Sequence, residues 1–248
     1  DYKRPAVQRF EGAKALFALT VEETSRLRAL AKNRDATLYM VLLAALNVFL
    51  FKLSGREDIV IGTPVTGRRH ADLENMVGML VNTLALRGFP NGEKSFHHLL
   101  GETRRRTLEA FANRDYPFED LVEKVSTNRD LSRSPLFDTM FVLHNEVGAA
   151  GDMPLTANME KETAAYRFEG TASLFDLTVH ALEAGDGLKF SWHYSTHLFK
   201  KETIHRFFAY FKNILRVLAE IPDRRIGTIE MITGEEKQRI LYDFNETT

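Results

Sequence analysis

The chain has 248 residues, of which 44% are hydrophobic, so it can bury one large core or two small ones. Its 33 lysines and arginines nearly balance its 34 aspartates and glutamates, which argues against nucleic acid or a membrane surface as the main partner. It contains no cysteine, which excludes disulfides, a thiolate nucleophile and a thiolate metal site. We expect a cytoplasmic location, since a chain without disulfides is compatible with a reducing compartment.

No segment predicts membrane insertion. The N-terminal residues, DYKRP, lack the apolar core of a signal peptide. The most apolar run, residues 38–51, includes Asn47 and is shorter than the roughly 20 residues that span a bilayer. We therefore interpret this run as the core helix of a soluble protein.

Helices and strands are predicted to alternate along the chain. Apolar residues at helical spacing mark the helices, and runs rich in β-branched residues mark the strands. The expected elements are a strand at 15–19, helices at 20–33 and 37–53, strands at 58–63 and 81–87, helices at 95–113 and from 117, a strand at 136–143, a hairpin at 173–196, and helices at 200–219 and from 233. The basic residues 64–70 predict a loop, either a solvated turn, which is the commoner case, or an anion site.

The stretch from Met76 to Arg87 is apolar except for Asn82 and Thr83. A strand at 81–87 would have two largely apolar faces, as a strand inside a sheet covered on both sides does. A buried amide is costly unless it is hydrogen-bonded. Asn82 is therefore either a satisfied core amide, which the residues alone favour, or a group that lines an interior channel.

The hairpin at 173–196 is expected to turn at Asp186-Gly187 and to bring the apolar faces of its two arms together. Its polar face would carry Asp176, Thr178, His180, Ser191 and His193. An aspartate close to two histidines suggests acid–base chemistry. The more common explanation is the polar side of a two-sided hairpin, because no nucleophile is presented to these groups.

Two further histidine pairs could suggest a metal site. His97 and His98 would point in directions about 100° apart on a helix, so we expect them at the surface. His193 and His197 have the i,i+4 spacing, but a strand followed by a turn does not hold such a pair on one face. We therefore expect no metal ion.

Five motifs, taken in order, resemble the condensation domains of nonribosomal peptide synthetases. One such motif alone would be weak, whereas the ordered set is specific. The motifs are IGTPVTGR at 61–68, VGMLVNTLALR at 77–87, NRDYPFE at 113–119, RDLSRSPLF at 129–137 and SLFDLT at 173–178. The resemblance covers nearly the whole chain, and residues 240–247 resemble the linker that enters an adenylation domain.

The resemblance implies that this chain is half of a domain. Condensation domains pair two chloramphenicol-acetyltransferase-like halves, and their His-His-x-x-x-Asp-Gly motif lies in the N-terminal half. That motif is absent here, because Glu102 and Thr103 follow His97 and His98 where Asp and Gly would be required. We expect an α/β half-domain at residues 1–232, with a mixed β-sheet packed with helices and a bridging hairpin, followed by a linker at 233–248. No catalytic residue is expected within it.

The family resemblance also implies a function. Condensation domains form a peptide bond when the amine of a carrier-bound acceptor attacks the thioester of a carrier-bound donor. No cofactor is expected on the chain itself, and the substrates would arrive on the phosphopantetheine arms of upstream and downstream carrier domains. The N-terminal half and a downstream adenylation domain are the other expected partners, in a bacterial pathway of antibiotic biosynthesis.

The resemblance assigns roles to ten residues. The half-domain would provide one wall of the substrate channel, together with structural or carrier-facing groups. The expected channel residues are Asn82, Thr83, Gly78, Thr63 and Pro64, and the expected structural or carrier-facing residues are Arg68, Arg133, Pro117, Phe118 and Asp176. Two alternatives remain: a non-catalytic scaffold that docks carrier domains, and another acyltransferase of the superfamily that uses a carrier or coenzyme A.

Overall fold

The computed structural model describes residues 1–67, 72, 76, 78, 80–125, 130–145, 171–232, 234–238 and 241. The chain forms two compact units, and each is assembled from three separate stretches. Unit 1 consists of Asp1–Val21, Val60–Leu86 and Thr107–Lys201, and unit 2 consists of Glu22–Ile59, Arg87–Arg106 and Glu202–Thr248. Neither unit is a continuous block of sequence.

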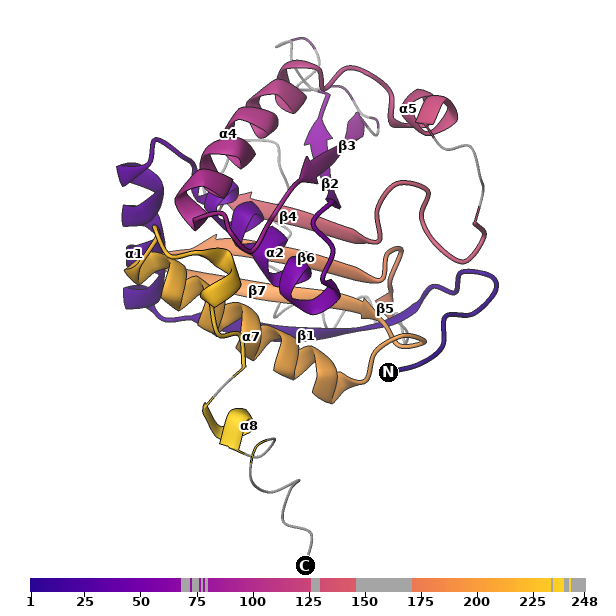
Figure 1. Ribbon diagram of the computed structural model, residues 1–248. Helices are drawn as coiled ribbons and strands as arrows, with labels where there is room; N and C mark the ends of the chain where they lie inside the picture. Colours follow the sequence, from indigo (N-terminus) through magenta and orange to yellow (C-terminus); the bar gives the residue numbers. More distant parts are fainter. Residues whose placement is uncertain are drawn as a thin grey trace, which may run out of the picture. The chain divides into compact units, whose positions relative to one another are not determined.

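Unit 1 contains nearly all of a seven-stranded sheet with the order β3-β2-β4-β6-β7-β1-β5 (Figure 1). β2, β4 and β6 run parallel, whereas β6, β7, β1 and β5 run antiparallel. The strands are β1 Glu11–Leu19, β2 Ile59–Thr66, β3 Val81–Gly88, β4 Thr139–Asn145, β5 Thr171–Ala172, β6 Leu177–Ala184 and β7 Gly187–Ser195. The expected α/β fold with a mixed sheet is confirmed.

Most of the helices belong wholly or mainly to unit 2, and α5 belongs to unit 1. The helices are α1 Val21–Asn33, α2 Leu38–Ser54, α4 Phe96–Ala112, α5 Phe118–Val125, α7 Lys201–Glu220, α8 Gly234–Gln238 and the short 3₁₀ helix η1 Ile226–Thr228. The expected Thr233 cap lies outside the described residues. No described helix is long and apolar enough to cross a membrane alone; only α1 and α2 together, bent by 104°, pass that test.

Helix α2 is the centre of unit 2, and both of its ends follow from the sequence. The Thr37 hydroxyl accepts a hydrogen bond from the Met40 amide at 3.2 Å, and Gly55 ends the helix with φ of +68°. Phe49 is fully buried and contacts the rings of Phe207 and Phe211 edge-on, at 5.7 and 5.8 Å between centroids. The prediction of a core helix is confirmed.

The hairpin forms as predicted, except for the position of its turn. Ala184 pairs with Gly187, so the turn consists of Gly185 and Asp186, and Gly185 provides the positive φ of +55°. The register therefore differs by two residues from a turn at Asp186-Gly187. Side chains alternate with a period of two, so the same residues share the same faces. Val179 still lies opposite Trp192, both fully buried.

The structure corrects the environment predicted for residues 81–87. β3 is the first strand in the sheet order, not an inner one, and it pairs only with β2 among the described strands. One face carries the buried Leu84 and Leu86, whereas Val81 on the other face is 58% exposed. Hydrophobicity alone predicted neither the edge position of β3 nor the exposure of this face, because Val81 and Ala85 on the exposed face are apolar.

Two further strand boundaries differ from the prediction. β2 continues through Pro64 to Thr66, so the expected loop does not begin at residue 64. The residues of β2 that pair with β4 are Ile61 and Gly62. Pro64 lies beyond this pairing, so a residue without an N–H group is compatible with its position. β4 begins at Thr139 rather than at 136, because residues 136–138 belong to the turn that precedes it.

Within unit 2, Gly88 provides the space that a buried amide requires. Asn47 is 2% exposed and donates its Nδ2 to the Leu43 carbonyl at 2.9 Å, while its Oδ1 is buried without a partner. A Cβ added at Gly88 would lie 2.2 Å from Asn47 Oδ1 and 2.8 Å from its Cγ. A side chain therefore cannot be added at Gly88 unless Asn47 moves.

We predict that Gly88→Ala lowers the free energy of unfolding by about 1 to 3 kcal/mol, because it overpacks this contact. In the Asn47→Ala background the same substitution should cost less than about 0.5 kcal/mol, since the clashing amide is gone. Urea denaturation of the four chains in this double-mutant cycle measures both values. An equal cost in both backgrounds would show that the contact with Asn47 is not what requires glycine.

Candidate functional site

The sequence motifs that carried the family resemblance meet at one place in unit 1, around the ring of Phe137. This ring precedes β4 and contacts Phe118 at the start of α5, with 5.6 Å between centroids. It also contacts Phe175, just before β6, at 5.3 Å. β4 and β6 are parallel neighbours, so the turns that enter them lie at the same end of the sheet.

Gly62 of β2 completes this aromatic cluster. A Cβ added at Gly62 would lie 2.2 Å from Phe137 Cε2 and 2.3 Å from its Cζ, so the ring occupies the space of a missing side chain. Only glycine permits such a close approach without displacing the ring. Four of the five motifs thus contribute to one packed cluster, which explains why they occur together in one sequence.

The Asn82 side chain of the remaining motif is fully hydrogen-bonded to backbone. Its Nδ2 donates to the carbonyls of Arg114 and Tyr116 at 2.7 and 2.8 Å. Its Oδ1 accepts from the amides of Thr83 and Phe118 at 2.8 and 3.2 Å. The neighbours determine the amide orientation, because carbonyls face Nδ2 and N–H groups face Oδ1.

These contacts match the satisfied amide that the residues alone favoured. Asn82 fixes the loop between α4 and α5, including Pro117 and the first turn of α5. The half-buried Phe118 then reaches the Phe137 ring. Asn82 therefore positions the aromatic cluster through the loop. The sequence did not predict its partners, since any residue type supplies a carbonyl.

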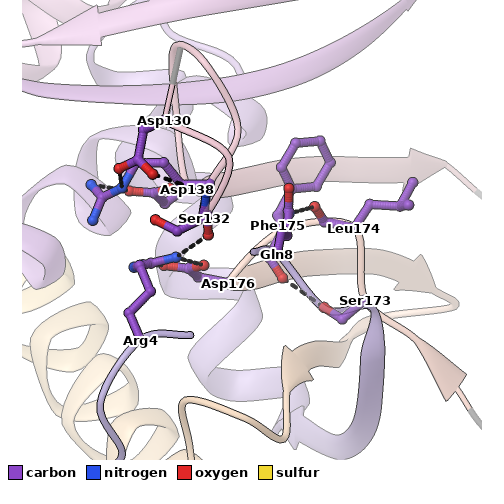
Figure 2. A network of polar contacts seen from close by, with 10 residues as sticks. Arg4, Gln8, Asp130, Ser132, Asp138, Ser173, Leu174, Phe175 and Asp176 are labelled. Atoms are coloured by element: carbon purple, nitrogen blue, oxygen red, sulfur yellow. Dashed lines mark hydrogen bonds and ion pairs between the residues drawn. The ribbon is translucent and has the colours of Figure 1, made fainter. Parts of the chain in front are cut away.

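A second network ties the N-terminal segment to the start of β6 (Figure 2). Arg4 forms a two-pronged ion pair with Asp176, with Nη1 to Oδ1 at 3.0 Å and Nη2 bonded to Oδ2. Its Nη1 also donates to the Ser132 carbonyl at 3.1 Å. The hydrogen bond that Arg4 donates to Asp176 raises the pKa of Arg4 above its usual value. Asp176 thus pairs with Arg4 and not with His180 or His193, the histidines that the sequence placed near it.

Two more carboxylates lie beside this pair (Figure 2). Asp130 accepts from the Ser132 amide at 2.9 Å, and hydrogen bonding to Ser132 lowers the pKa of Asp130. Arg133 donates to Asp138 at 3.2 Å, although Asp138 Oδ1 is buried without a partner. Burial, followed by the negative charge of Asp176, raises the pKa of Asp138. Arg133 therefore neutralises part of an acidic cluster within its own turn.

The other expected channel residues lie in different environments. Thr63 is 2% exposed, and its hydroxyl donates to the Phe141 carbonyl at 2.9 Å. Pro64 is half-buried in β2, and Gly78 is exposed with open space where a Cβ would be. Arg68 lies outside the described residues. Asn82, Thr63 and Pro64 thus come from the neighbouring strands β3 and β2.

The polar face of the hairpin carries a histidine cluster that the sequence predicted only in part. His180 and His193 contact each other as expected, with 4.9 Å between ring centroids, but as diagonal neighbours, since His180 pairs with Ser191 and His193 with Thr178. His144 of β4 joins them, with its Nε2 3.2 Å from His180 Nδ1. His144 was not predicted, because β4 is not a sequence neighbour of the hairpin and only the parallel pairing of β4 with β6 brings it there.

The three histidines favour the neutral form. Burial lowers the pKa of His180 to about 4, with smaller contributions from His193 and His144. Burial also lowers the pKa of His144 and of His193, and Lys14 contributes to the shift of His193. Within the described part of the chain, no group of three or more His, Cys, Asp or Glu side chains is arranged to hold a metal ion. The separate pair His97 and His98 is exposed, as predicted.

Fold and site geometry together define a mixed α/β fold of the chloramphenicol-acetyltransferase-like type. The family profile described as "Condensation domain" matches residues 1–241. The chain therefore belongs to the condensation domain family of nonribosomal peptide synthetases, the family of peptide-bond-forming acyltransferases.

Relatives of known function are much longer than this chain. It is 46% identical to gramicidin S synthase 2 of Brevibacillus brevis over 252 residues, which cover 100% of the chain and 6% of that protein. It is 44% identical to tyrocidine synthase 3 of Brevibacillus parabrevis, over 100% of the chain and 4% of that protein. The chain thus spans a small part of these synthetases.

Solved structures share the fold. A four-domain nonribosomal peptide synthetase bound to AMP and glycine is similar with a TM-score of 0.81 at 24% identity, over 96% of this chain and 19% of that one. The first condensation domain of the calcium-dependent antibiotic synthetase, in complex with a substrate analogue, has a TM-score of 0.71 at 20% identity. That match covers 93% of this chain and 51% of the other, so this chain spans about half of that structure.

We predict that Arg4→Lys lowers the free energy of unfolding by about 1 to 2 kcal/mol, because lysine cannot bond Asp176 and Ser132 with a planar fork. Hydrogen exchange at the Gln8 amide, which bonds the Leu131 carbonyl at 2.7 Å, should become faster as the segment loosens. Arg26→Lys is the control, since Arg26 forms its ion pairs on the surface. Equal effects of the two substitutions would contradict an anchoring role for Arg4.

A second prediction concerns acid stability. The folded pKa of His180 lies below its unfolded value of about 6.5, so the unfolded state binds more protons as the pH falls from 6.5 towards 4. Stability should thus be complete above pH 6.5 and decline below it by about 1.4 kcal/mol per pH unit for each histidine kept neutral.

The measurement is urea denaturation between pH 7.5 and 5. His180→Asn should flatten the decline, because asparagine does not titrate. His98→Asn should keep the full decline, since His98 is an exposed histidine beside Glu102. A decline of the same steepness in the His180 variant would rule out this histidine as its source.

Proposed function

We propose that residues 1–232 form the C-terminal half of a condensation domain, and that residues 233–248 form a linker towards a downstream adenylation domain. The observation that carries the proposal is the packing of the family motifs around Phe137 and Asn82 in one unit. The coverage of about half of a solved condensation domain supports the half-domain assignment.

The complete domain would join two carrier-bound acyl groups. The acceptor amine attacks the donor thioester carbonyl, a C–N bond forms, and the C–S bond breaks. The thiol of the donor arm leaves with the proton that the amine loses. The base for this proton would come from the N-terminal half, because the His-His-x-x-x-Asp-Gly motif is not in this chain. We expect the isolated chain to be inactive.

This half would contribute one wall of the substrate channel. The edge strand β3 with Asn82 and Thr83, the adjacent β2 with Thr63 and Pro64, and the exposed Gly78 are the proposed wall. Since the Asn82 amide is occupied by backbone groups, its proposed contribution is to hold the α4–α5 loop in place rather than to bond substrate. Rigid positioning of this kind supports catalysis when reacting groups must meet at short distance.

The remaining proposed roles are structural or carrier-facing. Asp176, Pro117 and Phe118 would keep the motif cluster assembled, as their contacts suggest. Arg68 and the exposed Arg133 would face acidic carrier domains, whose phosphopantetheine arms deliver the substrates. The proposed setting is a multidomain bacterial synthetase in the cytoplasm.

Complementation tests the proposal. The chain is mixed with the N-terminal half of the matching gramicidin S synthase 2 condensation domain and with loaded donor and acceptor carriers. We expect dipeptide from the mixture and none from either half alone. Product from this chain alone would refute the half-domain assignment. Binding of carriers with no product from the mixture would favour a docking scaffold, and product with coenzyme A thioesters would favour another acyltransferase.

In the complemented enzyme, we predict that Asn82→Ala lowers kcat about 10-fold or more while the chain stays folded, because the α4–α5 loop and the first residue of α5 lose three hydrogen bonds to β3. Asn113→Ala is the matched control, since the Asn113 side chain bonds only the Glu109 carbonyl of its own helix. Unchanged turnover for Asn82→Ala would contradict a positioning role.

A further inference from the structure

One face of the sheet in unit 1 carries a diagonal row of basic side chains. Lys14 pairs with His193 in the register of β1 and β7. His193 contacts His180 of β6, and His180 contacts His144 of β4. Lys189 lies on the same face, because it pairs with Ala18 and Leu182, which alternate in step with Lys14 and His180. The row crosses four neighbouring strands.

The contacts within the row involve imidazole rings and a hydroxyl. His144 Nε2 lies 3.2 Å from His180 Nδ1, and the two rings are nearly parallel, with an interplanar angle of 16°. His193 Nε2 lies 3.0 Å from the Ser191 hydroxyl. Imidazoles therefore contact each other and a hydroxyl, and no contact with a carboxylate occurs among the residues that the structure describes.

Charge on this face is unbalanced. Among the described residues of β1, β4, β6 and β7, the titratable groups on this face are Lys14, His144, His180, Lys189 and His193. The neutral state of the histidines follows from burial and, for His180 and His193, from neighbouring positive groups, and no described acidic group acts on them. A negative charge bound beside a partly buried cluster of this composition would favour its protonated form and raise the pKa of its histidines.

The row is accessible to a small ligand. His144, His180 and His193 are each only partly buried, and Lys14 and Lys189 are exposed. Thr178 and Ser191 lie on the same face and add hydroxyl donors. Hydroxyls, imidazolium N–H groups and ammonium groups are the donors that phosphate oxygens accept from.

We propose that this face binds a small anion of the phosphate class between His180, His193 and Lys14. Phosphate fits this site better than a carboxylate does. It has more acceptor oxygens and up to two negative charges, so donors from several neighbouring strands can bond it at the same time. Binding and protonation are linked, so the anion binds more tightly where the histidines take up protons. This proposal does not depend on the proposed condensation function.

The test is an NMR titration of the histidine ring signals in the full 248-residue chain, at constant ionic strength. The probes are inorganic phosphate and dimethyl phosphate, a diester that keeps a single charge, with chloride as the reference ion. We expect phosphate to raise the apparent pKa of His180 and His193 by at least one unit. Its Kd should be at least 10-fold lower at pH 6 than at pH 8, and binding of dimethyl phosphate should be weaker.

Two variants identify the site. Lys14→Gln changes an exposed residue, so the chain should stay folded, and it should weaken phosphate binding at least 3-fold. His144→Asn should reduce the pH dependence of binding. The exposed His97 and His98 of unit 2 are the internal control. Shifts at His180 and His193 no larger than those at His97 and His98, or an unchanged Kd for Lys14→Gln, would mean an adventitious ion only and would overturn the proposal.

Discussion

The packing of the Phe137 ring against the bare backbone of Gly62 is the constraint on which the motif region depends. With a side chain at Gly62 the ring could not lie there, because its nearest carbon would be 2.2 Å from the added Cβ. From this place the ring contacts Phe118 and Phe175, which begin α5 and precede β6. The absence of a side chain at Gly62 thus allows three turns that are distant in sequence to meet at one end of the sheet.

The polar side chains around this cluster form hydrogen bonds mainly with backbone groups. Asn82 bonds four backbone groups, and Arg4 bonds the Ser132 carbonyl in addition to Asp176. Side chains that bond backbone determine the path of a loop irrespective of the residues it contains. The motifs therefore preserve a scaffold of packed turns.

Structural features that follow from local sequence patterns could be predicted. Features that depend on partners far away in the sequence could not. The hairpin faces were predicted correctly because a shift of two residues leaves side-chain alternation unchanged. The hydrogen bonds of Asn82 agree with the satisfied amide that the residues alone favoured, but Asn82 is half-buried on an edge strand and not in the core that this interpretation assumed. The edge position of β3, the contribution of His144 and the Arg4–Asp176 pair were not predicted. Each depends on strand order or on a partner far away in the sequence, up to 172 positions for Arg4 and Asp176.

The position of β1 has a consequence for how the chain is made. β1 precedes the other described strands of the sheet in sequence, yet its partners β5 and β7 follow β2, β3 and β4, with Glu11 paired to Ala172 and Gly12 to Ser195. During translation the N-terminal strand must wait until almost the whole sheet has left the ribosome. Contacts of such high sequence separation form slowly, and an unpaired strand is prone to aggregation meanwhile. The unpaired β1 is therefore the strand of this sheet that stays exposed longest during synthesis.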